Sequence, residues 1–468
     1  MSKLLKNWGF LFASNVTQSV LNFFVFLLLA RKLNPEGFGS LNALLALASI
    51  FSAFVVNSTA NLVITREVTL HPKTTSSIFR LVFPLRMFSL LVTTIIMIFY
   101  YKHTGESRTV VIAGAALIVV STVLWDLAES IAFGHFVTKI TTFISIIASI
   151  IWLGMVILLP DIGLTFEVVV WMYAGVFMVR GIVYILWCYK KFIHKNREPS
   201  LISFKSLLLM SMPFLWMRVV GTFGDQIPLL ILDQKIGTAE VGYYSVGNRL
   251  VMPIVLTVTT GLRAAFPFMT KLYQENKEKF NADIILSFSF VLIAGATIAS
   301  GLSITSELWI PWLFGAEYDH SIDIFKYQAW SGAILCFDMV LSTVLSSTYR
   351  QKLLAIITTL DVVIIFPIIY VGIEYGGEGM ALAKLIGVFI AIMMHIVLIT
   401  KSMRINLFSK SLFLALLYFI ILAVSSILLS TLPLKMMVFI LMLSSYSLYK
   451  SSPLRELVGI VKTRLIRK

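Results

Sequence analysis

The sequence is poor in charged residues: Lys, Arg, Asp and Glu together make up 13% of its 468 residues. A soluble domain carries roughly twice that share, whereas hydrophobic residues fill 58% of this chain. Cysteine is also scarce. The two present, Cys188 and Cys336, lie inside apolar runs and form no CxxC, zinc-ligand or disulfide-framework pattern. The composition excludes a soluble domain of this length and predicts a protein that lies largely within a membrane.

Fourteen apolar runs follow one another along the chain, and a helix of about 20 residues spans a bilayer. They cover residues 8–30, 41–64, 81–100, 110–133, 140–159, 168–189, 207–232, 246–268, 284–304, 325–347, 353–371, 380–400, 412–432 and 436–449. Hydrocarbon offers no partner for an unpaired backbone amide, so each run should be a helix. The first run is too long for a signal-peptide core and lacks a cleavage site, so we expect it to remain as a signal anchor. The predicted fold is an all-α polytopic membrane protein with about fourteen transmembrane helices.

Positive charges fall unevenly on the connections between these runs. With the N-terminus inside, the outer connections contain only six of the 38 Lys and Arg residues: Arg31, Lys32, Lys102, Arg108, Lys235 and Lys435. Basic connections resist translocation, so both termini are predicted to be cytoplasmic. The net charge of +15 is then explained by orientation in the bilayer, with contacts to anionic lipid at the basic tail. It gives no support to nucleic-acid binding.

Seven cations lie within the predicted spans: Arg86, Arg180, Arg218, Arg249, Arg263, Lys326 and Lys384. A Lys or Arg at mid-bilayer costs about 2.5 to 3.5 kcal/mol on insertion scales, so such residues need water or protein around them. Four of the seven are predicted to extend toward the headgroups from near helix ends, namely Arg86, Arg180, Lys326 and Lys384. The remaining three arginines are the candidates for a functional site.

An internal repeat relates the first and seventh spans. Each carries polar or small residues on one helix face, 203 positions apart: Asn15, Gln18, Ser19 and Asn22, then Arg218, Gly221, Thr222 and Asp225. The same offset aligns LNPEGFG (33–39) with IGTAEVG (236–242), each just after its helix. Both copies begin on the predicted cytoplasmic side, so the halves should be parallel repeats about an axis along the membrane normal.

The repeat predicts four segments along the chain. They are an N-lobe of six spans (1–189), a basic cytoplasmic linker (190–206), a C-lobe of six spans (207–400), and a last helix pair with a basic tail (401–468). Two pseudo-symmetric lobes of this kind should enclose a central cavity, lined by the polar faces of spans one and seven.

Five segments, in order along the chain, carry recognisable motifs: LLLARKLNPEGFGSLNAL, GDQIPLLILDQKIGTAEVGYYSVGNRL, AAFPFMTKLYQENKEKF, LFGAEY and GGEGMALAKLIG. Together they resemble the polysaccharide transporter family of the multidrug/oligosaccharidyl-lipid/polysaccharide flippase superfamily. The resemblance implies an O-antigen-type flippase of the bacterial inner membrane, which moves an undecaprenyl-pyrophosphate-linked oligosaccharide from the cytoplasmic to the outer leaflet by alternating access. It also implies a monomer that works beside polysaccharide polymerase and chain-length machinery.

The chemistry of such a substrate suits the residues within the spans. A pyrophosphate brings about two negative charges, which Arg218, Arg249 and Arg263 could bind as bidentate donors. Sugar hydroxyls could accept or donate neutral hydrogen bonds with Asn15, Gln18, Ser19, Asn22, Asn57 and Asn61. Since Arg249 and Arg263 are 14 residues apart, they should lie about 21 Å apart on nearly one face of a helix. Both could therefore pass an anion along the cavity.

Acidic residues within the spans should pair. The expected pairs are Asp126 and Glu129 with an arginine such as Arg180, and Asp338 and Asp361 between neighbouring helices. Asp225 could neutralise Arg218 or respond to a coupling proton. The histidines show no metal-ligand spacing, and His395 alone lies deep in a span. No cofactor is expected, and the sequence leaves open whether a proton or a sodium ion is coupled to transport.

Three alternatives to this function remain open. A lipid-II-type flippase shares the cationic cavity and differs mainly in its substrate. A multidrug or cation exporter of the same superfamily would favour an acidic or aromatic cavity. A glycan polymerase or ligase needs a large outer loop with catalytic groups, whereas the longest outer connection here, residues 305–324, has about 20 residues. The sequence therefore argues against an enzyme.

Overall fold

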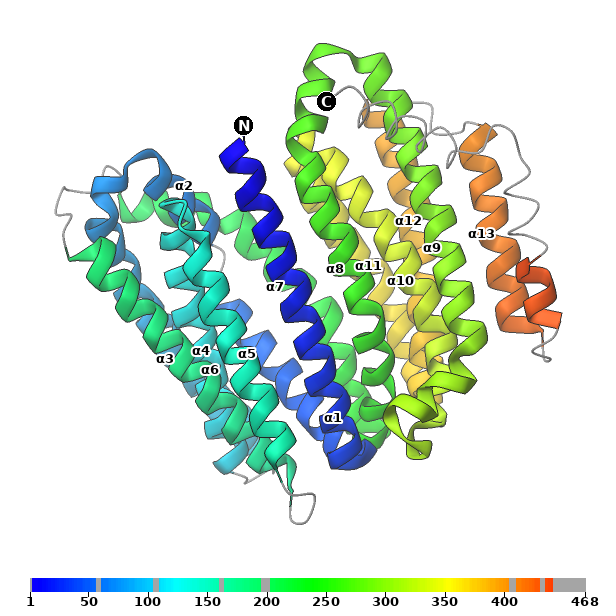
Figure 1. Cartoon of the computed structure of the whole chain (residues 1–468), viewed down its shortest axis with the longest axis horizontal. Helices are drawn as coiled ribbons and strands as arrows, with labels where there is room; N and C mark the ends of the chain where they lie inside the picture. Colours follow the sequence, from blue (N-terminus) through cyan, green and yellow to red (C-terminus); the bar gives the residue numbers. More distant parts are fainter. Residues whose placement is uncertain are drawn as a thin grey trace. The chain divides into compact units, whose positions relative to one another are not determined.

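The computed structural model describes residues 2–55, 60–103, 109–159, 164–194, 203–403, 410–429 and 434–440. Throughout these ranges the regular structure is helical, and no strand occurs in them. Figure 1 shows the chain as a series of long helices. Nine helical stretches of the described residues are long and apolar enough to cross a membrane. The predicted all-α polytopic membrane fold is therefore confirmed.

Contacts divide the chain into two compact units, Met1–Gly242 and Tyr243–Lys468. The first contains α1 (Ser2–Phe54), α2 (Ala60–Leu70), α3 (Thr75–His103), α4 (Thr109–Gly134), α5 (Thr138–Leu158), α6 (Phe166–Cys188), α7 (Phe204–Lys235) and the first turn of α8 (Thr238–Glu275). Here α4 packs along α6, and α1 packs against both α5 and α7. The two polar faces that the sequence predicts on spans one and seven therefore lie in the same unit, and whether they line one cavity stays a prediction.

The second unit contains the rest of α8 together with α9 (Lys277–Phe314), α10 (His320–Ser347), α11 (Gln351–Gly372), α12 (Gly376–Met403) and α13 (Lys410–Leu428). In this unit α10 packs against α9 and α12, α11 packs against α12, and α13 packs against α9. Helix α12 thus lies between two partners, and side chains from three helices can meet inside the unit.

Two turns of the first unit, one in each copy of the predicted repeat, share a backbone feature. Asn34, inside α1, has φ 58°, and Gly237, between α7 and α8, has φ 133°. Figure 1 shows α1 turning back at its lower end. These residues are 203 positions apart, which is the predicted offset. Each turn therefore uses a left-handed residue to join two helices of its repeat.

Two glycines let these turns approach closely. A Cβ on Gly39 would lie 1.7 Å from the carbonyl oxygen of Thr238, and a Cβ on Gly242 would lie 2.1 Å from that of Pro35. The contact is reciprocal, because Gly242 and Thr238 are the counterparts of Gly39 and Pro35 at the offset of 203. Such an exchange of equivalent contacts is what a two-fold relation between the turns requires.

The individual spans follow the predicted runs with one departure. The second run, 41–64, is interrupted where α1 ends at Phe54. The first two runs form two helices that meet at a kink at Asn34, ahead of Pro35, within α1. The last run, 436–449, falls largely outside the described residues. The count of fourteen spans and the lobe boundaries at residues 189, 206 and 400 stay predictions.

Candidate functional site

The predicted polar faces of α1 and α7 lie in one unit. Gln18, Ser19 and Asn22 are half-buried on α1, whereas Arg218 and Asp225 are exposed on α7. α1 packs against α7, and a ring contact between Phe54 and Phe223 joins the two elements. Whether they bind a substrate stays a prediction.

The other predicted site residues are more dispersed. Arg249 is half-buried on the part of α8 that belongs to the second unit. Arg263 lies in the same helix, but its side chain falls outside the described residues, as does that of Asn15 in α1. Asn57 also lies outside the described residues. The structure therefore brings the predicted residues into two groups, one on α1 and α7 and one on α8.

Asn61 belongs to a group of charged residues that the sequence did not connect. Its Oδ1 atom accepts a hydrogen bond from Arg86 Nη2 at 2.6 Å, and its side chain also bonds to Asp126. Arg86 Nη1 donates to the carbonyl oxygen of Val123 at 3.1 Å. Only 1% of Arg86 is exposed. The prediction that Arg86 extends to the headgroups is wrong, because polar partners from α2 and α4 enclose its guanidinium inside the unit.

Arg180 completes this group from α6. Its guanidinium carbon lies 4.1 Å from the ring centre of Trp125 and 4.5 Å from that of Phe177. The negative charges of Glu129 and Asp126 also act on it, and a direct ion pair with these carboxylates stays a prediction. The prediction that Arg180 extends toward the headgroups is also wrong, because aromatic faces attract and cover its charge.

We call Asn61, Arg86, Asp126, Glu129 and Arg180 the buried charge cluster. Its charges come from α3, α4 and α6, and Asn61 comes from α2. The positive charge of Arg218 on α7 also acts on Asp126. One of the three candidate arginines is thus electrostatically linked to the cluster. Of the remaining cations in the spans, Lys326 bonds to Asp323 at 2.6 Å near the start of α10.

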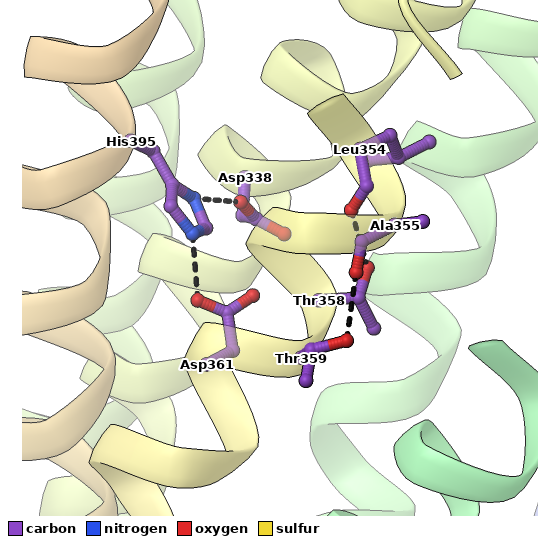
Figure 2. A network of polar contacts seen from close by, with 7 residues as sticks. All are labelled: Asp338, Leu354, Ala355, Thr358, Thr359, Asp361 and His395. Carbon is purple, nitrogen blue, oxygen red and sulfur yellow. Dashed lines mark hydrogen bonds and ion pairs between the residues drawn. The ribbon is translucent and has the colours of Figure 1, made fainter. Parts of the chain in front are cut away.

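A second polar group lies in the other unit and joins three helices. His395 of α12 has its Nδ1 atom 2.8 Å from Asp338 Oδ1 on α10 and its Nε2 atom 2.6 Å from Asp361 Oδ1 on α11. Figure 2 shows the imidazole between the two carboxyl groups. We call Asp338, Asp361 and His395 the aspartate–histidine triad. The predicted contacts of the two aspartates between helices are confirmed, but the residue that bridges them was missed.

One signal in the sequence could have revealed the triad. His395 is the one histidine placed deep in a predicted span, and Asp338 and Asp361 lie in the two preceding spans. A buried imidazole needs partners for both ring nitrogens, so its nearest intramembrane carboxylates were natural candidates. Within the described residues, no cluster of three or more His, Cys, Asp or Glu side chains is suited to hold a metal ion.

A family model described as "Polysaccharide biosynthesis protein" matches residues 4–273 of the chain. A curated relative, the capsular polysaccharide biosynthesis protein CapF of Staphylococcus aureus, is 20% identical over 408 residues. That alignment covers 84% of this chain and 98% of the relative. The motifs and the family match therefore agree with each other across the first repeat and into the second.

Solved structures of transporters share the fold. An inward-facing multidrug resistance MATE family transporter of the MOP superfamily is 16% identical, with a TM-score of 0.68, covering 83% of this chain and 94% of that chain. The lipid II flippase MurJ in an inward closed conformation is 15% identical, with a TM-score of 0.66, covering 93% of this chain and 98% of that chain. The likeness in each case extends over nearly the whole molecule.

Proposed function

Because the chain belongs to the polysaccharide biosynthesis protein family, we propose that it is a flippase for lipid-linked oligosaccharides. Its substrate is an undecaprenyl-pyrophosphate-linked repeat unit, which it moves from the cytoplasmic to the outer leaflet by alternating access. Family membership supports a role in making surface polysaccharide, and the fold shared with MATE transporters and MurJ supports movement of a substrate across the membrane. The setting that we propose is a bacterial inner membrane, with both termini in the cytoplasm.

The observation that carries this proposal is the exposed guanidinium of Arg218 on an apolar span. α7 contains a candidate membrane span, Leu215–Lys235, and Arg218 lies near its start with an exposed side chain. Exposure of a full positive charge to lipid is costly, so such a residue is expected to face water or an anionic ligand. A pyrophosphate group offers the oxygens that a guanidinium binds in a bidentate manner.

The remaining site residues have roles that follow from their chemistry. We propose that Arg249 and Arg263 bind the anion one after the other along α8. Gln18, Ser19 and Asn22 of α1 would form hydrogen bonds with sugar hydroxyls, together with Asn15 and Asn57. Asn61 is engaged by Arg86 at 2.6 Å, so we propose that it acts by fixing the buried charge cluster near Arg218.

Single substitutions of the three arginines test this site. Arg218, Arg249 and Arg263 are each replaced by Ala and by Lys in cells that depend on this protein, and surface polysaccharide is measured at equal protein levels. We expect Ala at one or more of these positions to remove most of the polysaccharide and Lys to restore only part, because Lys keeps the charge but lacks the planar pair of donors.

A matched control is Lys279→Ala, which removes an exposed cation from the first turn of α9. It should leave polysaccharide at the wild-type level. Normal polysaccharide in all three Arg→Ala variants would reject the proposed site. Unchanged polysaccharide combined with altered sensitivity to cationic drugs would instead favour a multidrug exporter.

A further inference from the structure

The aspartate–histidine triad lies where α10, α11 and α12 meet. The side chain of His395 is 3% exposed, whereas those of Asp338 and Asp361 are 26% and 23% exposed. Its ring is therefore buried inside the second unit, and the two carboxyl groups in contact with it are partly exposed. These carboxyl groups offer a proton a route to the imidazole.

The two contacts of the ring determine how many protons the triad must hold. A neutral imidazole has one N–H donor and one lone pair, and an ionised carboxylate can only accept. Both nitrogen–oxygen distances, 2.8 Å and 2.6 Å, are hydrogen-bond distances. With a neutral ring and two ionised carboxylates, one of these contacts would place a lone pair against a negative oxygen. The observed arrangement thus requires one further proton, on the ring or on a carboxyl group.

From this geometry we propose that Asp338, His395 and Asp361 form the binding site for one exchangeable proton, whose release separates α12 from α10 or from α11. The effect of this proton on transport rests on the proposed flippase function, whereas the binding of the proton to the triad does not. When the proton leaves, only one ring nitrogen can donate, and the other contact becomes repulsive. One link between helices is lost, and the packing of the three helices changes with the protonation of the triad.

The surroundings of the triad favour a proton over a metal cation. The titratable groups that act on His395 are Asp338 of α10 and Asp361 of α11, and those that act on Asp361 are His395 and Asp338. The other side chains drawn beside it in Figure 2, Thr358 and Thr359, donate to carbonyl oxygens of their own helix. Each ring nitrogen already lies at hydrogen-bond distance from a carboxylate oxygen, 2.8 Å and 2.6 Å, and a proton is the cation that such a contact shares.

Protonation of the triad can be followed directly in purified full-length protein that carries ¹⁵N-labelled histidine. The signal of His395 is the one that disappears in His395→Gln. We expect the wild-type ring to show protons on or strongly shared with both nitrogens at low pH, and to change in one step as pH rises. A His395 signal that stays constant over the whole pH range in which the protein is folded would overturn the proposal.

Asp361→Asn provides the sharper test. An amide at this position can donate to the lone pair of Nε2, so the ring keeps two hydrogen bonds without an exchangeable proton. We expect this variant to fold and its His395 signal to lose the pH-dependent step. The same reasoning applies to Asp338→Asn at Nδ1, which serves if the first variant does not fold. Thr358→Val is the control, because its hydroxyl donates to Leu354 of the same helix at 3.0 Å. The Thr358→Val control should show the same pH-dependent step as the wild type. An Asp361→Asn protein whose His395 signal still showed that step would refute the proposal.

Coupling to transport is measured in proteoliposomes loaded with a fluorescent undecaprenyl-pyrophosphate-linked oligosaccharide. A pH gradient should accelerate translocation by the wild type, and Asp361→Asn should reduce that acceleration by about tenfold or more. Acceleration by a sodium gradient at constant pH, with no response to pH, would contradict the proposal. If the wild type moved no substrate at all, the proposed flippase function would fail, while the histidine titration would still decide whether the triad binds a proton.

Discussion

A guanidinium inside a membrane protein is stable only where partners replace water. Arg86 meets this requirement through Asn61 on α2 and the carbonyl oxygen of Val123 on α4. These partners come from segments 25 and 37 residues away in the chain. Position within the apolar run therefore could not identify the environment of Arg86, because contacts between distant segments determine it.

Removal of Arg86 should be strongly destabilising. Arg86→Ala removes one of the three guanidinium charges that act on Asp126, those of Arg86, Arg180 and Arg218, and breaking a buried ion pair typically costs about 3 to 5 kcal/mol. We expect a large drop in melting temperature in detergent. Arg86→Ala combined with Asp126→Asn should recover part of it, since the unpaired carboxylate is then absent. Arg80→Ala, at an exposed position of α3, is the control. An Arg86→Ala protein with the same melting temperature as the Arg80→Ala control would contradict this account.

His135, in the turn after α4, should make stability dependent on pH. Burial and then the positive charge of Lys191 lower the pKa of His135, and its ring stacks on Phe192 with centroids 4.0 Å apart. The unfolded chain takes up this proton near pH 6.5, whereas the folded protein resists it. Stability is therefore greatest above about pH 6.5 and falls as pH falls through that value.

The measurement is the melting temperature at several pH values between neutral and mildly acidic. His135→Gln should reduce the loss of stability on acidification, even if it melts lower overall. His194→Gln, at an exposed position, should keep the wild-type pH dependence. Equal pH dependence in all three proteins would mean that His135 is not the responsible group.

At the scale of helices, periodicity in the sequence identified most elements and the relation between repeats. The offset of 203 could be read from short motifs because each repeat must turn its chain with the same backbone geometry, at Asn34 and at Gly237. The break between Phe54 and Ala60 and the meeting of three helices at His395 were not predicted. Both depend on packing between helices, which periodicity in a single run does not encode.

The close approach of the two turns predicts a cost for any side chain at Gly39 or Gly242. A Cβ at either position would clash with a backbone carbonyl, at 1.7 Å and 2.1 Å respectively. Gly39→Ala and Gly242→Ala should therefore each lower the melting temperature and the yield of folded protein. Because the contact is reciprocal, the two variants should behave alike.

Gly154 on α5 is the matched control, since a Cβ there meets no atom within 4 Å. Gly154→Ala should be neutral or stabilising, because Ala is favoured over Gly within a helix by about 0.8 to 1.0 kcal/mol. Normal melting of Gly39→Ala and Gly242→Ala would show that the turns are not in contact in the membrane.

For the whole molecule, the predicted orientation can be tested with single reporter cysteines. Both native cysteines are buried, so they should react little with a membrane-impermeant maleimide. We expect Glu317→Cys, at an exposed position in a connection predicted to lie outside, to be labelled in intact cells. Lys277→Cys, exposed at the start of α9, should be labelled only after the membrane is opened. The reverse pattern would place the termini outside.

The central claim is that an exposed arginine on α7 receives the phosphorylated head of a lipid-linked oligosaccharide and that the protein carries this head across the bilayer. Its most direct test is the movement of a fluorescent undecaprenyl-pyrophosphate-linked oligosaccharide between leaflets of proteoliposomes, scored by its accessibility to a membrane-impermeant quencher. We predict rapid movement with the wild type, slow movement with Arg218→Ala and intermediate movement with Arg218→Lys. A wild-type rate equal to that of protein-free vesicles, or an Arg218→Ala rate equal to that of the wild type, would contradict the account.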